Sequence, residues 1–161
     1  YTSNHDVNWA EGTPIQLFGG KKGSIASFVV AAYMKSVPMI YNGQEIGYAQ
    51  KIDYFSRTPI DWSTADAEML AEYKKIIAFR NTSNAIKKGV FTGYSSDAVS
   101  AFTMVKDAEK VLVLSNLTNN TVKYLVPPSL KGSWKDGFTG VAVTLDLETT
   151  LAPYQYLVLK N

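Results

Sequence analysis

The spacing of the apolar residues changes near Lys87, and this change constrains the fold more than any other feature of the sequence. Before Lys87 the apolar residues recur at helical spacing, and after it they alternate with their neighbours as in strands. A helix-bearing region followed by several short strands is typical of an α/β part joined to an all-β part. The sequence therefore predicts two domains, residues 1–86 and residues 87–161.

Two helical patterns lie in the first of these regions. Between Lys21 and Ser36, and again between Asp66 and Asn84, apolar residues fall on one helical face. The first face is made of Ile25, Phe28, Val29, Ala32 and Tyr33, and the second of Met69, Leu70, Tyr73, Ile76, Ile77 and Arg80. Ser63 or Thr64 is the expected N-cap of the second helix.

Short strands are expected on both sides of the first helix. Pro38 cannot continue a helix, and the run Met39-Ile40-Tyr41 after it is continuously apolar, as buried parallel strands are. We take Tyr1–Ser3 as the end of an earlier strand, which predicts a strand–helix–strand unit. The long loop from Tyr48 to Ser63 holds charged residues that we expect to be solvated or to cap a helix. These include Asp53, Arg57 and Asp61.

Several stretches after Lys87 have the composition and spacing of short strands. They are Val99–Val105, Val111–Asn116, Thr121–Val126, Val141–Leu147 and Tyr154–Lys160. In one of them Val141, Val143, Leu145 and Leu147 occupy alternate positions, which predicts a single buried face. This pattern predicts a small antiparallel β-sandwich.

The histidine and cysteine content limits the chemistry of the chain. His5 is the only histidine and there is no cysteine, which excludes a cysteine nucleophile, a disulfide framework and a zinc site of several His or Cys ligands. A net charge of +2 gives no reason to expect nucleic acid as a partner. No apolar run reaches the roughly 18–20 residues that span a bilayer, so no membrane span is expected.

The single histidine lies in a polar triplet, Asn4-His5-Asp6, near the start of the sequence. If Tyr1–Ser3 ends a strand, the triplet lies where the chain leaves a sheet, which in α/β barrels is the rim that holds the active site. The alternative is an ordinary turn, because Asn and Asp hydrogen-bond their own backbone in turns. The triplet by itself favours the turn.

Four motifs in order resemble the α-amylase family, glycoside hydrolase family thirteen. Asn4-His5-Asp6 is similar to the pattern that ends the family's seventh barrel strand, and Pro38–Gly47 to its eighth. Arg57–Trp62 and the helix that ends with Ile76–Arg80 also match, and a β-rich tail follows. The resemblance covers essentially the whole chain. It implies the last two βα units of a TIM barrel and then a C-terminal β-sandwich domain.

The resemblance also implies an activity, the retaining cleavage of α-1,4-glucosidic bonds in starch or maltooligosaccharides. Asp6 matches the family's carboxylate that stabilises the transition state, and His5 matches the residue that hydrogen-bonds the same sugar. A carboxylate suits this role because its bonds to hydroxyls strengthen as positive charge develops on the ring. The family's nucleophile, general acid and calcium ligands have no counterpart here. We therefore expect this chain alone to be inactive and without a metal, with calcium in a longer parent.

Several alternatives stay open. Val7 departs from the family pattern, in which many members carry a polar residue, so a related α-glucosidase, debranching enzyme or transglycosylase is a rival. A non-catalytic carbohydrate-binding module, with Tyr94, Trp134 or Tyr154 as sugar platforms, is a rival of another class. A purely structural fragment is a third. The absence of cysteine is compatible with a secreted or periplasmic bacterial protein.

Three further expectations concern the first region. Trp9 is either a sugar-stacking platform or a plug over the barrel end. Glu45 lies between glycines and is expected to bond loop amides or a neighbouring side chain, not to act as a catalytic acid. Since the barrel is incomplete, we expect the chain to self-associate through residues 1–60.

Overall fold

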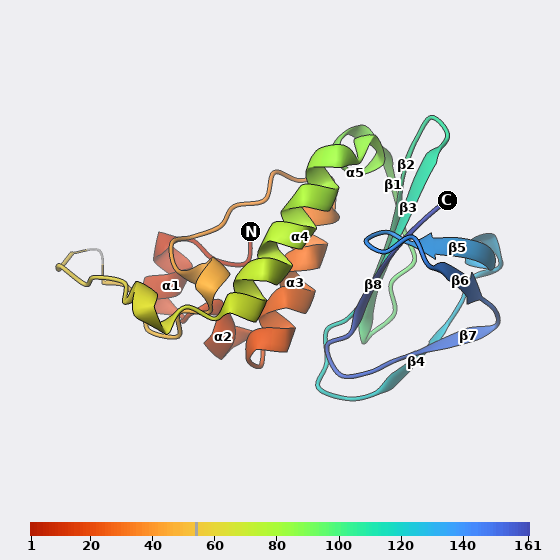
Figure 1. Cartoon of the computed structure of the whole chain (residues 1–161). Coiled ribbons are helices and arrows are strands. Elements are labelled where there is room, and N and C mark those ends of the chain that lie inside the picture. The colour runs from red at the N-terminus through yellow and green to blue at the C-terminus, as the bar shows by residue number, and fades with distance from the viewer. Residues whose placement is uncertain (54) are drawn as a thin grey trace.

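The computed structural model describes residues 1–53 and 55–161, and its helices precede its strands (Figure 1). The helices are α1 (His5–Ala10), α2 (Pro14–Leu17), α3 (Lys21–Tyr33), α4 (Ala67–Thr82) and α5 (Asn84–Lys88), with 3-10 turns η1 (Gln44–Ile46), η2 (Trp62–Thr64) and η3 (Pro128–Leu130). The strands are β1 (Val90–Gly93), β2 (Val99–Lys106), β3 (Glu109–Asn116), β4 (Val122–Leu125), β5 (Gly132–Asp136), β6 (Ala142–Leu145), β7 (Glu148–Leu151) and β8 (Tyr156–Lys160). This order confirms the predicted class. No helix in the described part of the chain is long and apolar enough to cross a membrane.

The helices α3 and α4 lie side by side, and both confirm predicted helices (Figure 1). Asp66 begins α4, because its carboxylate accepts a hydrogen bond from Met69 N at 2.9 Å. The predicted N-cap, Ser63 or Thr64, is wrong, since both residues lie inside η2. Asp61 caps that turn by accepting a hydrogen bond from Ser63 N at 3.0 Å, as expected for a charge of this loop.

All the strands pair in an antiparallel manner. Six of them form one sheet in the order β1-β2-β3-β8-β5-β6, and β4 pairs with β7 in a second sheet. The hairpin β2–β3 places Lys106 opposite Glu109, and Asp107 in its turn has a φ of 54°. The last strand, β8, pairs with both β3 and β5, so the end of the chain lies inside the sheet. The predicted antiparallel sandwich is present.

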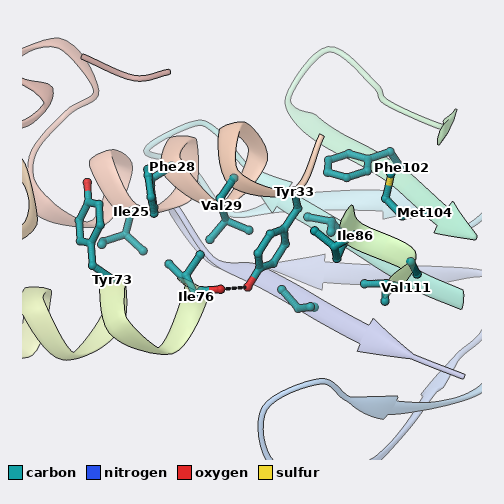
Figure 2. Close-up of a cluster of buried hydrophobic side chains, with 14 of the residues drawn as sticks. Ile25, Phe28, Val29, Tyr33, Tyr73, Ile76, Ile86, Phe102, Met104 and Val111 are labelled. Atoms are coloured by element: carbon teal, nitrogen blue, oxygen red, sulfur yellow. Dashed lines mark hydrogen bonds between the residues drawn. The ribbon is translucent and has the colours of Figure 1, made fainter. Parts of the chain in front are cut away.

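The central strands β2 and β3 are buried on both faces. Phe102, Met104 and Val111 face the helices, whereas Leu112 and Leu114 face the smaller sheet. The core on the helical side also contains Ile25, Phe28, Val29, Tyr33, Tyr73, Ile76 and Ile86, as Figure 2 shows. The core on the other side contains Tyr124, Val126, Leu130, Trp134, Leu145 and Leu151. The six-stranded sheet is therefore the middle of three layers.

Buried hydrogen bonds hold the helical layer together and fix it to the sheet. The Tyr33 hydroxyl on α3 donates to the carbonyl oxygen of Ile76 on α4 at 2.9 Å (Figure 2). Ser115 Oγ on β3 donates to the carbonyl oxygen of Ala26 on α3 at 3.0 Å. The division into residues 1–86 and 87–161 stays a prediction, because this core joins residues from both ranges.

The two predicted parallel strands are not strands in the structure. Among the described residues before Val90, no strand is present, so the assignments of Tyr1–Ser3 and Met39–Tyr41 are wrong. A strand requires a hydrogen-bonded neighbour, and Tyr41 N instead donates to the Gln44 side chain at 3.3 Å. An apolar run next to a proline thus becomes an extended segment without a sheet.

The five strands predicted for the second region are all present, but the structure has eight strands among the described residues there and corrects the bounds of those predicted. Each of the predicted strands is found with shifted ends, while β1, β5 and β7 were not predicted. Leu145 and Val143 face the core as expected. Val141 and Leu147 are 63% and 67% exposed, so their predicted burial is wrong. Both lie outside β6, which is short because it is the edge strand of its sheet.

Candidate functional site

The triplet Asn4-His5-Asp6 begins helix α1 and does not end a strand. Asn4 is the N-cap, and its Oδ1 accepts a hydrogen bond from Val7 N at 2.8 Å. The local hydrogen bonding expected of a turn is therefore present at Asn4. The side chains of His5 and Asp6, which occupy the first turn of the helix, take no part in this cap.

His5 and Asp6 lie next to each other and face outward. His5 Nε2 is 3.4 Å from Asp6 Oδ1, and the two side chains are 57% and 70% exposed. Asp6 also lies in the first helical turn, where backbone N–H groups favour a negative charge. The arrangement can present a carboxylate and an imidazole to one ligand.

Trp9 lies on the same side of α1, because residues three and four positions apart are neighbours on a helix. Its ring is 46% exposed and meets the ring of Phe55 edge to face, with centroids 5.9 Å apart. Phe55 comes from the loop between η1 and η2. Two aromatic rings thus accompany the histidine and the carboxylate.

The loop after η1 holds α1 in place. Asn8 is buried in the helix and its Oδ1 accepts a hydrogen bond from Ile52 N at 2.7 Å. Lys51 Nζ donates to the carbonyl oxygen of Ala10 at 3.0 Å, near the helix end. The candidate residues are therefore carried by a short helix with fixed contacts at its middle and its end.

Gln44 contacts the segment before the triplet, and the sequence analysis did not single it out. It is buried, and its Nε2 donates to Thr2 Oγ1 at 2.7 Å and to the Tyr73 hydroxyl at 2.9 Å. Burial raises the pKa of Tyr73 to about 12, so this hydroxyl stays protonated at neutral pH. Gln44 thereby ties the segment before the triplet to α4. The sequence feature that could have drawn attention to Gln44 is its position directly after Gly43. Gly43 is the N-cap of η1 and has a φ of 84°.

Glu45 differs in detail from its prediction. Its Oε2 is buried and has no hydrogen-bond partner among the described residues, so the expected bond to this oxygen is not seen. The residue lines a groove along α4 together with Leu70, Tyr73 and Ile77. Asp6 is not among the residues that line this groove.

The three proposed sugar platforms do not form one exposed surface. Trp134 is 5% exposed, and its Nε1 donates to the carbonyl oxygen of Leu130 at 2.9 Å inside the core. Tyr94 packs against the same core, while Tyr154 lies on the helical side and lines a groove there. A sandwich with coplanar platforms is therefore not what the structure shows. Within the described residues, no group of three metal-ligating His, Asp or Glu side chains occurs.

Comparison with known proteins identifies relatives of this arrangement. No protein-family model matches the chain. Alpha-amylase 2 of Dictyoglomus thermophilum is 30% identical over 162 aligned residues, which cover 92% of this chain and 27% of that protein. Neopullulanase 2 of Thermoactinomyces vulgaris is 31% identical over 153 residues, covering 86% of this chain and 26% of that protein. The chain thus spans only 27% and 26% of the lengths of these relatives.

A solved structure shares the fold. The trehalulose synthase from Pseudomonas mesoacidophila MX-45 superposes with a TM-score of 0.77 over 98% of this chain and 42% of that one, at 15% identity. Helices and sheets of this chain therefore have the arrangement found in a longer enzyme. Taken together, the curated relatives and the shared fold show that the chain resembles the C-terminal portion of members of the α-amylase family, glycoside hydrolase family thirteen.

Proposed function

We propose that this chain is part of a retaining α-glucan hydrolase, to which it contributes Asp6 and His5. The observation that carries the proposal is their position: the two side chains lie 3.4 Å apart on α1 and both are more than half exposed. The names of the relatives, an alpha-amylase and a neopullulanase, support α-glucans as the substrate class. The α-1,4 bond of starch or maltooligosaccharides is the bond we assign.

The proposed roles follow from the chemistry of glycoside cleavage. A retaining enzyme uses one carboxylate as nucleophile and another as acid, and its transition state carries positive charge on the sugar ring. Asp6 in our proposal is a third carboxylate that accepts hydrogen bonds from ring hydroxyls, and these bonds strengthen as that charge develops. His5 hydrogen-bonds the same sugar, and the exposed ring of Trp9 offers it an apolar surface.

We assign neither the nucleophile nor the general acid to this chain. Glu45 lines a groove along α4, and Asp6 is not among the residues of that groove. We therefore propose that residues 1–161 alone do not hydrolyse glucans and that the activity belongs to a longer protein, which is also where calcium would bind. A related α-glucosidase or transglycosylase is the alternative within this proposal.

The test is made in a full-length enzyme that contains this sequence. Asp6→Asn should lower kcat by about 10³-fold, with a smaller effect on KM, because the interaction is made mainly in the transition state. Asp97→Asn is the matched control, since Asp97 is exposed on the sandwich. An Asp6→Asn enzyme with unchanged kcat would contradict the role of Asp6. His5→Ala should raise KM more than it lowers kcat if His5 binds the sugar in the ground state.

A further inference from the structure

The segment before η1 contains two neighbouring residues that can react with each other. Asn42 is followed by Gly43, and this is the only Asn-Gly pair in the sequence. The backbone nitrogen that follows an asparagine can attack the side-chain amide, and glycine hinders the attack least because it has no side chain. Whether the attack takes place in a folded chain depends on how firmly the two groups are held.

The backbone at Asn42 and Gly43 forms a tight turn. Gln44 N donates to the carbonyl oxygen of Tyr41 at 2.9 Å, which closes a turn of four residues. Gly43, the third residue of the turn, has a φ of 84° and a ψ of −13°, as in a type II turn. The peptide group between Asn42 and Gly43 is the central one of the turn and takes no part in the closing hydrogen bond.

Neither reacting group is held by a hydrogen bond. Asn42 is exposed, and its side-chain amide has no hydrogen-bond partner among the described residues. In the same part of the chain, the N–H of Gly43 donates to no acceptor. No hydrogen bond therefore has to break before the Gly43 nitrogen reaches the Asn42 side chain.

Asp136 and Gly137 form a contrasting pair in the same chain. Gly137 N donates to the carbonyl oxygen of Val158 at 2.7 Å. Asp136 Oδ1 accepts hydrogen bonds from Phe138 N at 3.0 Å and from Thr139 N at 2.7 Å. Both the nitrogen and the side chain are thus bound to other groups, and an attack at this position would first have to break these bonds.

We propose that Asn42 is a site of spontaneous deamidation. The Gly43 nitrogen loses its proton and forms a bond to Asn42 Cγ, the bond from Cγ to Nδ2 breaks, and ammonia leaves with that proton. Water then opens the cyclic imide at one of its two carbonyl groups. One product is aspartate, and the other is isoaspartate, in which the main chain runs through the former side chain and gains one carbon. Both products carry one additional negative charge.

The isoaspartate product disturbs an anchor of the candidate site. Gln44 is buried two positions after Asn42, and its Nε2 donates to Thr2 Oγ1 and to the Tyr73 hydroxyl. Gly43 between them is also buried, and a Cβ added to it would lie 3.1 Å from Tyr48 Cβ. A longer main chain at this turn has no free space, so the turn must move and Gln44 moves away from its two partners.

The test follows the reaction in the folded 161-residue chain. After incubation in a mildly alkaline buffer, peptide mapping should find aspartate and isoaspartate in the peptide that contains Asn42, and enzymatic methylation should label the isoaspartate. Asn42→Gln should remove most of this signal, because the larger ring that a glutamine side chain would form closes more slowly. A peptide without isoaspartate in the unsubstituted chain overturns the proposal.

Asp136→Asn is the matched control, because it creates a second Asn-Gly pair whose glycine nitrogen is hydrogen-bonded. In this folded variant, position 136 should react about tenfold or more slowly than Asn42, since a buried hydrogen bond must break before the attack. In urea, where this bond is lost, the two positions should react at similar rates. A rate ratio that is no larger in the folded variant than in urea overturns the proposal.

The effect on the anchor is measured with the separated products. Ion exchange isolates the isoaspartate form, and freshly prepared Asn42→Asp supplies the same charge without the added carbon. The isoaspartate form should unfold at a lower urea concentration than the unsubstituted chain, whereas Asn42→Asp should match it, because the Asn42 side chain makes no contact that the change removes. Equal midpoints for all three forms would refute the link between Asn42 and the Gln44 anchor.

Discussion

Gln44 Nε2 donates a hydrogen bond to the hydroxyl oxygen of Tyr73 at 2.9 Å, and this bond joins η1 to the middle of α4. The same amide group also holds Thr2, three positions before His5. A residue between two glycines thus positions the segment that leads into the candidate site. Its neighbour in sequence, Glu45, has the charge that would attract attention first, yet Gln44 makes the contacts.

Gln44→Ala should destabilise the chain measurably. The substitution leaves buried polar groups without their partner, which costs about 1–3 kcal/mol in the free energy of unfolding. Urea unfolding followed by circular dichroism measures the loss. Gln50→Ala, at an exposed position of the following loop, is the control and should change stability by less than about 0.5 kcal/mol. Equal stability of the two variants would show that the Gln44 network is not important.

Asp66 should make the stability depend on pH in the acid range. The hydrogen bond from Lys21 lowers the pKa of Asp66, and the backbone N–H of Met69 lowers it further. A lowered folded-state pKa gives stability that is present above the unfolded pKa, near ~3.9, and is lost as the pH falls through the folded value. The unfolding free energy of the unmodified chain should therefore fall between about pH 5 and the folded pKa.

Two substitutions separate the two contacts of Asp66. Asp66→Asn keeps an N-cap for α4 but removes the charge, so it should lose the acid dependence and only part of the stability at pH 7. Asp66→Ala should lose both. Asp97→Asn serves as control and should keep the pH profile of the unmodified chain. A profile that stays unchanged in Asp66→Asn would contradict this assignment.

Gly23→Ala should be strongly destabilising. A Cβ at Gly23 would lie 1.6 Å from the carbonyl oxygen of Phe18, so the corner between α2 and α3 must move. We expect a cost at the upper end of the ~1–3 kcal/mol typical of overpacking. Gly93→Ala is the comparison, because the added atom would meet Phe91 at an ordinary 3.5 Å. Thermal unfolding of both variants measures the difference, and similar melting temperatures would refute the predicted clash.

Self-association of the isolated chain stays a prediction, and the structure suggests where to test it. Val37 is 88% exposed and Met39 41% exposed, next to the extended segment that has no strand neighbour. Apolar groups of this kind favour contacts between copies. Light scattering over a concentration series should show association, and the double variant Val37→Lys with Met39→Lys should reduce it. Leu125→Lys, a change at a 75% exposed sandwich position, should not. A chain that is monomeric at all concentrations would contradict the prediction.

The elements predicted best from sequence were those with a strong local signal. The spacing of Ile25, Phe28 and Tyr33 fixed α3, because a helical face follows from residues within the same segment. The hairpin β2–β3 was equally clear, since both strands are long and their turn is short. The weaker predictions concerned short edge elements. Gly132–Asp136, for example, contains glycine, serine and charged residues that carry little strand propensity.

Other features could not be read from local sequence because they depend on distant partners. Met39–Tyr41 has the composition of a buried strand, but strand formation needs a neighbour that pairs with it. Val141 and Leu147 continue an alternating pattern beyond the point where β6 stops pairing. For the candidate site, the sequence pointed to Asp6 and His5, and the structure brings them together. The clamp by Asn8 and Ile52 depends on residues 44 positions apart and left no local signal.

The burial of β2 and β3 on both faces has a consequence for how this chain can be divided. A protein cut at Lys87 would leave Phe102, Met104 and Val111 facing water, since the helices that cover them lie before the cut. Such a sandwich would not be an autonomous module that could be exchanged between proteins without redesign of that face. Heat should melt the helices and the sheets in a single cooperative transition, because neither layer is complete without the other.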